Sequence, residues 1–201
     1  FAFLHFFDPH WDYDPPPPYD RKFIDPEYSG EMDGKLDSMA PFLSVDMEMP
    51  GPDLQHVIDL YDGEIAYENY QVGRLIERLR EKGLMRHAVA VVASDHGEEF
   101  YEHQKFSHGH DVWEELIHVP MIIKWPEAQC FKSAPFFSRE RVGLIDLMPS
   151  FIDFFGLNEP EVSMMGNSIQ PYLERNQNNN DVSRSQFSES YDNNYCFAYL
   201  E

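Results

Sequence analysis

Cysteine, basic side chains and long apolar runs are all scarce in this chain of 201 residues. Its two cysteines, Cys130 and Cys196, match no metal-binding or redox spacing, so we interpret both as incidental. Two cysteines also do not fix the compartment in which the protein works. The longest apolar stretches, such as residues 119–123, fall far short of the roughly 18 residues of a membrane span. We therefore expect no segment that crosses a bilayer.

Positive charge is the second deficit. Fifteen Lys and Arg stand against 36 Asp and Glu, which gives a formal net charge of −21. Such a chain repels nucleic-acid phosphates and anionic membrane surfaces, so nucleic acid is not an expected partner. The acid excess by itself indicates a well-solvated surface. An anionic substrate would need a local pocket of positive charge.

The sequence does contain enough apolar material, 42% of all residues, for one sizeable core. Apolar β-branched runs alternate with segments of helical periodicity, which favours an α/β sandwich with a mostly parallel central sheet flanked by helices. A parallel sheet that starts at Phe1 needs neighbouring strands, so we expect the fold to be truncated on its N-terminal side. The expected elements are a strand at 1–7, a proline-rich loop at 8–53, a helix at 60–84, strands at 88–93 and 119–125, a helical turn near Trp113, a short strand at 141–144, a helix at 146–155, a linker at 176–185 and a hairpin at 187–200.

The strongest candidate for chemistry is the run Ser-Asp-His-Gly-Glu at residues 94–98, at the end of an expected strand. Asp95 and His96 offer a carboxylate oxygen and an imidazole nitrogen that can bind one divalent cation. Two ligands do not make a site, and an Asp–His pair in a loop is more often a turn or a surface hydrogen bond. The four histidines between Asp95 and Asp111 favour a functional site, because histidine is an infrequent residue.

A second candidate lies at residues 7–13, Phe-Asp-Pro-His-Trp-Asp-Tyr, where the first expected strand meets the proline-rich loop. His10 is its chemically competent side chain. The alternative interpretation is that His10 only caps a turn beside Pro9.

Four stretches, in order along the chain, resemble the sulfatase family of the alkaline phosphatase superfamily. Residues 3–10 (Phe-Leu-His-Phe-Phe-Asp-Pro-His) are similar to the family's strand that ends in Asp-Pro-His before a proline-rich loop. Residues 61–75 resemble its central helix, residues 94–120 its metal-ligand loop and next strand, and residues 146–168 its late helix and the segment that follows. The resemblance covers nearly the whole chain at plausible spacing.

The resemblance implies roles for four residues. Asp95 and His96 become metal ligands, usually of calcium in sulfatases and of manganese in some phosphonate and phosphodiester hydrolases. Many relatives have Asn in place of His96, and the softer imidazole shifts the expectation slightly toward a transition metal, although calcium remains the first expectation. His10 would contact the ester group. His108 fills a position that is a lysine or a histidine in relatives, and we expect it to share leaving-group protonation and oxyanion contact with His10.

The family nucleophile is a formylglycine made from a Cys or Ser in a Cys-x-Pro/Ala-x-Arg segment near the N-terminus. Neither cysteine of this chain lies in such a segment. Phe1 is not preceded by a starting Met or a leader, so we expect the true N-terminus, the nucleophile and the remaining metal ligands to lie upstream. By the same resemblance residues 1–175 are the C-terminal part of the α/β catalytic domain, and residues 176–201 are a linker and the start of a small antiparallel subdomain.

The implied function is metal-dependent hydrolysis of sulfate monoesters by the complete enzyme, with the chain itself inactive alone. A phosphonate or phosphodiester hydrolase of the same superfamily and a non-catalytic fragment or pseudoenzyme are the alternatives. The expected partner is a sulfated small molecule or glycan. The expected location is periplasmic or extracellular in preference to cytoplasmic, and the sequence indicates no oligomeric state.

Overall fold

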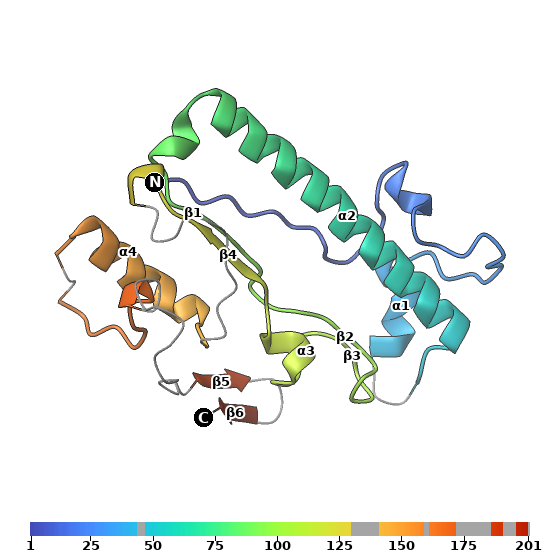
Figure 1. Cartoon of the computed structure of the whole chain (residues 1–201). Coiled ribbons are helices and arrows are strands. Elements are labelled where there is room, and N and C mark those ends of the chain that lie inside the picture. Colours follow the sequence, from blue (N-terminus) through green and yellow to red (C-terminus); the bar gives the residue numbers. More distant parts are fainter. Residues whose placement is uncertain (44–46, 130–140, 159–160, 172–185, 191–195, 201) are drawn as a thin grey trace, which may run out of the picture. The chain divides into compact units, whose positions relative to one another are not determined.

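The computed structural model describes residues 1–43, 47–129, 141–158, 161–171, 186–190 and 196–200. The chain divides into two compact units, and Figure 1 shows their helices and strands. The first unit contains residues 1–88 and 98–108, and the second contains residues 89–97 and 109–201. The polypeptide therefore leaves the first unit after residue 88 and returns to it for the short stretch 98–108. The expected boundary between residues 175 and 176 lies outside the described residues and stays a prediction.

Helix α2 (Gly51–Glu81) is the main structural element of the first unit and the longest helix in Figure 1. Pro52 lies in its first turn, where the missing N–H breaks no helical hydrogen bond. Val57, Leu60 and Glu64 are buried at helical spacing on one side. The sequence predicted this helix but placed its start at residue 60, because residues 51–53, Gly-Pro-Asp, were assigned to the preceding proline-rich loop.

The proline-rich segment packs along the N-terminal half of α2 (Figure 1). It forms only short helices, η1 (Tyr19–Arg21), α1 (Leu36–Met39) and η2 (Ala40–Leu43). Contact with α2 is close at Gly63, where an added Cβ would lie 2.8 Å from Pro15 Cγ and 2.9 Å from the Tyr19 carbonyl oxygen. The core of this unit consists of Tyr13, Met32, Met39, Met49, Val57, Leu60 and Phe106.

We expect Gly63→Ala to lower the free energy of unfolding by about 1–3 kcal/mol, because the new methyl group must displace backbone as well as Pro15. The matched control is Gly73→Ala in the same helix, where nothing lies within 4 Å of the added Cβ. That change should stabilise the protein by up to about 1 kcal/mol through helix propensity. Urea denaturation of both variants measures the difference, and equal effects at the two positions would show that the loop does not rest on α2.

The stretch 98–108 is a tight hairpin built on the core of the first unit. Strands β2 (Glu99–Phe100) and β3 (Phe106–Ser107) pair antiparallel, with Phe100 opposite Phe106. The fully buried Glu99 carboxylate braces the turn, accepting hydrogen bonds from the backbone N–H groups of His103 at 3.0 Å and Lys105 at 3.1 Å. Phe106 is buried in the core cluster. The hairpin is therefore held by the Phe106 side chain in the core and by the Glu99 carboxylate at its turn.

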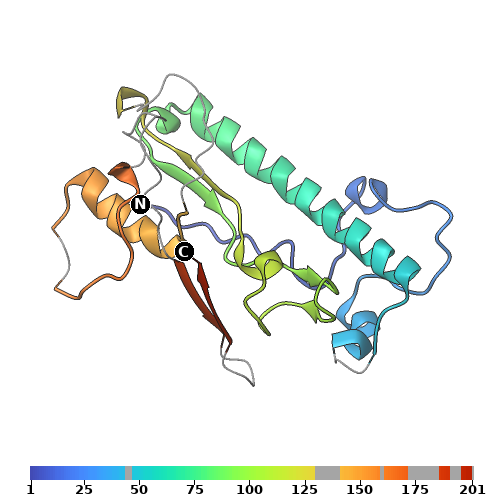
Figure 2. The ribbon, with the colours of Figure 1, turned by 60° about the horizontal axis from the view of Figure 1, so that its bottom comes forward.

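The second unit contains an antiparallel pair, β1 (Ala90–Ala93) with β4 (Met121–Lys124), which Figure 2 shows as two adjacent ribbons. The register places Ala90 opposite Lys124. Helix α4 (Leu147–Phe155) follows residues 141–146 and is capped at Gly156, as the sequence predicted. The remaining elements are η3 (Leu84–Arg86) in the first unit and α3 (Glu114–Ile117), η4 (Glu127–Gln129), η5 (Leu144–Asp146), β5 (Gln186–Ser190) and β6 (Cys196–Leu200) in the second.

Two strand predictions were wrong. Residues 1–7 form no strand, and Phe1, Phe3 and Phe7 are exposed instead of buried. A strand exists only as a member of a hydrogen-bonded ladder, and no described segment pairs with this one. Residues 141–144 lead into the 3-10 helix η5, because Asp146 Oδ2 accepts a hydrogen bond from the Gly143 N–H at 2.8 Å and turns the chain.

All strand pairs among the described residues are antiparallel, so the expected mostly parallel sheet is not seen there. The expected C-terminal hairpin is present as the pair β5–β6, with Phe187 opposite Tyr199. Its turn and the expected linker at 176–185 lie outside the described residues.

Candidate active site

His108 lies against a buried carboxylate in the first unit. Its Nδ1 atom is 3.0 Å from Glu98 Oε1 and 3.2 Å from Oε2. The Glu98 side chain is 4% exposed and the His108 side chain 20%. Tyr13, fully buried in the core, donates its hydroxyl to Glu98 Oε2 at 2.8 Å. Glu98 therefore accepts hydrogen bonds from both neighbours and links the imidazole to the core.

These contacts fix which nitrogen of His108 carries a proton. An ionised carboxylate can only accept hydrogen bonds. Glu98 therefore accepts one from the Tyr13 hydroxyl and one from His108 Nδ1, so Nδ1 carries a proton. In the neutral ring Nε2 then holds the lone pair, and in the charged ring Nε2 holds the proton that can be given away. The arrangement matches the carboxylate–imidazole pairs that hold a general acid or base in one tautomer.

His10 lies beside His108, as the sequence predicted for two residues of one site. The two ring centroids are 5.5 Å apart at an interplanar angle of 65°. Trp11 also contacts the His108 imidazole, with a centroid distance of 5.7 Å. His10 Nδ1 donates to the Trp11 carbonyl at 3.1 Å, since a carbonyl oxygen only accepts. The anchored Tyr13 holds this segment in place, which brings both imidazoles together.

Asp95 and His96 lie together in the second unit, directly after β1. Asp95 Oδ1 is 3.0 Å from the His96 backbone N–H and 4.0 Å from His96 Nε2. His96 Nδ1 donates to the Gly97 carbonyl at 2.9 Å, which leaves the lone pair of a neutral ring on Nε2. Ligand distances of about 2.0 to 2.4 Å allow two donor atoms at this separation to share one divalent cation.

The turn that presents this pair is closed by Gly97. Its N–H donates to the Leu116 carbonyl at 2.8 Å, and an added Cβ would overlap the Glu115 carbonyl oxygen. Only glycine fits there without moving backbone. Within the described ranges no group of three or more His, Cys, Asp or Glu side chains is arranged to hold a metal ion.

The tyrosine side chains around Glu98 stay neutral in the folded protein. Burial, with Glu98 as its neighbour, raises the pKa of Tyr13 well above the ordinary range, so Tyr13 remains a protonated donor. Burial also raises the pKa of Tyr61 to about 12. Because both phenols stay neutral, they add no charge beside Glu98 at any pH at which the protein is expected to work.

Glu64 is a second buried carboxyl group, on α2. Burial raises its pKa from 4.5 to about 8, a hydrogen bond from the Asp14 N–H lowers it in part, and Asp8 raises it further. The Asp14 N–H lies 3.0 Å from Oε1, and among the described residues none hydrogen-bonds Oε2. Glu64 therefore favours its protonated form in the folded protein.

This shift predicts a pH-dependent stability with a defined sign. Because the folded-state pKa lies above 4.5, the folded protein binds more protons than the unfolded chain between pH 4.5 and about 8. The contribution of Glu64 is complete below pH 4.5 and is lost as the pH rises through about 8, with a slope of up to about 1.4 kcal/mol per pH unit. Urea denaturation at several pH values should show this slope reduced in Glu64→Gln and unchanged in the exposed control Glu77→Gln.

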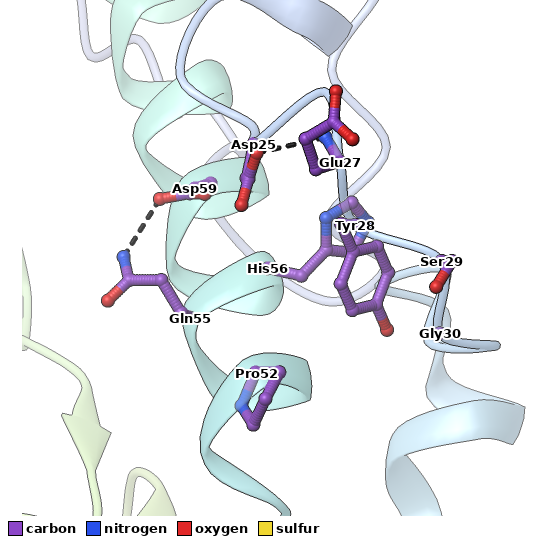
Figure 3. A pocket seen from close by; sticks show the side chains of 9 residues that line it. All are labelled: Asp25, Glu27, Tyr28, Ser29, Gly30, Pro52, Gln55, His56 and Asp59. Atoms are coloured by element: carbon purple, nitrogen blue, oxygen red, sulfur yellow. Dashed lines mark hydrogen bonds between the residues drawn. The ribbon is translucent and has the colours of Figure 1, made fainter.

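A separate cavity of about 370 Å³ lies between residues 25–30 and the first turns of α2 (Figure 3). The Tyr28 ring stacks on His56 with centroids 4.0 Å apart. Asp25, Glu27 and Asp59 give the lining negative charge. Such a lining repels an anionic ester, so this cavity is not suited to a sulfate group. The imidazoles of His10 and His108 are better suited to an anionic group, because an imidazole can carry positive charge.

Solved hydrolases share this fold. The structure is similar to a phosphonate monoester hydrolase from Silicibacter pomeroyi, with a TM-score of 0.67 and 25% identity over 90% of this chain and 38% of that one. A phosphonate monoester hydrolase of Agrobacterium radiobacter matches with a TM-score of 0.61 and 25% identity over 70% of this chain and 27% of that one. The fold is therefore that of the hydrolases of the alkaline phosphatase superfamily.

The sulfatase family model matches residues 1–157, and the chain belongs to the sulfatase family. It is 29% identical to arylsulfatase K of Bos taurus over 119 residues, which are 59% of this chain and 21% of that protein. It is 32% identical over 103 residues to an N-acetylglucosamine-6-O-sulfatase of Bacteroides thetaiotaomicron, covering 51% of this chain and 18% of that protein. The chain thus spans about a fifth of the length of these relatives.

Sequence reasoning missed the role of two residues. Glu98 was visible only as the last residue of the Ser-Asp-His-Gly-Glu run, and Tyr13 only as an aromatic residue after His10. The one available signal was that the run at 94–98 ends in an acid near a histidine-rich loop. Nothing in the spacing indicated that this acid pairs with His108.

Proposed function

We propose that the protein containing this chain hydrolyses sulfate monoesters. The observation that carries the proposal is the meeting of His10 and His108 beside the buried Glu98, all within the region matched by the sulfatase family model. The site offers two imidazoles to an anionic group in an otherwise acidic protein. Such groups supply the proton that a leaving alkoxide or phenoxide requires.

We assign leaving-group protonation to His108 and oxyanion contact to His10. The Nδ1 atom of His108 faces a carboxylate, which stabilises the imidazolium form. His10 Nδ1 donates to a neutral carbonyl instead. Because the imidazolium form carries the Nε2 proton, we assign His108 as the proton donor and His10 as a hydrogen-bond donor to a non-bridging oxygen.

We propose Asp95 and His96 as metal ligands, with calcium as the first candidate and manganese as the second. A divalent cation held by this pair would supply positive charge for an anionic group. Support comes from the 4.0 Å separation of Asp95 Oδ1 and His96 Nε2 and from the Gly97 contact that sets the ring tautomer.

The complete enzyme should turn over an aryl sulfate faster than an aryl phosphodiester when each is tested with calcium and with manganese. The phosphonate monoester hydrolases of similar fold are the reason to include the phosphodiester. A higher kcat/KM for the phosphodiester would make the protein a phosphodiester or phosphonate hydrolase. No turnover of either ester with either metal would leave a non-catalytic protein as the correct description.

Further proposals concern the whole protein. A sulfated small molecule or glycan is the proposed substrate class, supported by the similarity to an N-acetylglucosamine-6-O-sulfatase. We propose that residues 1–175 are the C-terminal part of an α/β sandwich whose sheet is mostly parallel, and that the location is periplasmic or extracellular. Among the helices of the described residues, none has the length and apolarity required to cross a bilayer.

A further inference from the structure

We propose that Glu98 is the positioning residue of His108 and that Tyr13 holds Glu98 for this task. The inference deepens the proposed function and rests on the assignment of His108 as the general acid. It follows from the hydrogen-bonded chain Tyr13 Oη to Glu98 Oε2 and Glu98 Oε1 to His108 Nδ1, with lengths of 2.8 and 3.0 Å.

The burial of the three groups separates this arrangement from a surface ion pair. Glu98 is 4% exposed, so a carboxylate that left this position would lose the hydrogen bonds from Tyr13 and His108 with little water nearby to replace them. Tyr13 is fully buried, and its backbone N–H is fixed to the Gly34 carbonyl at 2.9 Å. The carboxylate therefore has one well-defined position. His108, the outermost of the three, is the group that remains accessible to a substrate.

The geometry defines a balanced proton transfer. As an oxygen nucleophile forms its bond to sulfur, the bond between sulfur and the leaving oxygen breaks, and its electron pair goes to that oxygen. The leaving oxygen takes the proton from His108 Nε2, and the N–H bonding pair stays on Nε2. The ring becomes neutral and keeps its Nδ1 proton, which remains hydrogen-bonded to Glu98. Glu98 itself neither gains nor loses a proton.

A positioning role and a structural role differ in how the loss of activity depends on the leaving group. Protonation matters most for a poor leaving group such as a simple phenol or an alcohol, and little for 4-nitrophenol. In the full-length protein we expect Glu98→Gln to lower kcat for phenyl sulfate by about 10²-fold, at the low end of what general acid catalysis contributes, with a much smaller loss for 4-nitrophenyl sulfate. KM should change little for either substrate.

Glu99→Gln is the matched control. Glu99 is the adjacent buried carboxylate, and it braces the hairpin turn through the His103 and Lys105 N–H groups. Its replacement should lower stability and reduce the activity on both esters by the same factor. An equal loss on both esters in Glu98→Gln as well would overturn the positioning role and leave Glu98 as a structural carboxylate.

Three further variants make the outcome decisive. In a His108→Ala background, Glu98→Gln should cause no additional loss on phenyl sulfate, because its effect acts through the imidazole. A leaving-group-dependent loss in His108→Ala but not in Glu98→Gln would reject this inference alone, whereas no such loss in His108→Ala would reject the general-acid assignment itself. Should Glu98→Gln fail to fold, Tyr13→Phe tests the same chain, and the expected result is a smaller loss that again falls mainly on phenyl sulfate.

Discussion

Replacing His108 with alanine is expected to lower kcat for aryl sulfates with poor leaving groups by roughly 10²- to 10⁴-fold, the contribution of a general acid. The free energy of unfolding should fall by only about 1–3 kcal/mol, because Glu98 loses the hydrogen bond from His108 but keeps the one from Tyr13. Steady-state kinetics and urea denaturation of the full-length protein measure the two quantities separately.

His118→Ala is the control for this change. The His118 side chain is 78% exposed, and it pairs with the equally exposed Glu114 at 3.3 Å. Both activity and stability should stay close to those of the unchanged protein. Unchanged turnover in His108→Ala on a sulfate ester would remove His108 from the mechanism.

Asp95→Ala should abolish tight binding of a divalent cation and lower turnover by roughly 10³-fold, because charge neutralisation by a metal contributes several kcal/mol to transition-state binding. The Asp95 side chain is 74% exposed, so the metal-free protein should keep its stability within about 0.5 kcal/mol. Titration calorimetry with calcium and manganese, and activity as a function of metal concentration, measure the effect. Treatment of the unchanged protein with a chelator should reproduce it.

The matched control is Glu77→Ala, which removes an exposed carboxylate on α2 without touching the 94–97 turn. It corrects for weak cation binding by the acidic surface as a whole. Equal metal affinity in the two variants would show that Asp95 is not a ligand.

Local signals in the sequence predicted the elements that depend only on local physics. Helix α2 was recognisable from its apolar periodicity, and α4 from the capping glycine at position 156. The strand expected at residues 1–7 depends on a partner strand, which no local pattern specifies. The apolar character of that segment was correctly recognised, but its burial was not.

The candidate site was also predictable only where local signals specify it. His10 and His108 were identified by residue type and by family resemblance, and they do lie side by side. The link through Glu98 was not predictable, because it depends on the hairpin that folds residue 108 back over residue 98. That hairpin turns at Tyr101 and Gln104, two non-glycine residues with positive φ angles of 71° and 68°. Such residues rarely adopt this conformation, so the sequence gives no sign of the turn.

The hydrogen bond between Tyr13 and Glu98 joins positions 85 residues apart in the chain. Closing so long a loop has an entropic cost that the local contacts of α2 do not have, so helix α2 can form well before this link. Orientation of the His108 ring is therefore acquired only with the complete tertiary structure. A partly folded intermediate can be rich in helix and still have no aligned proton donor.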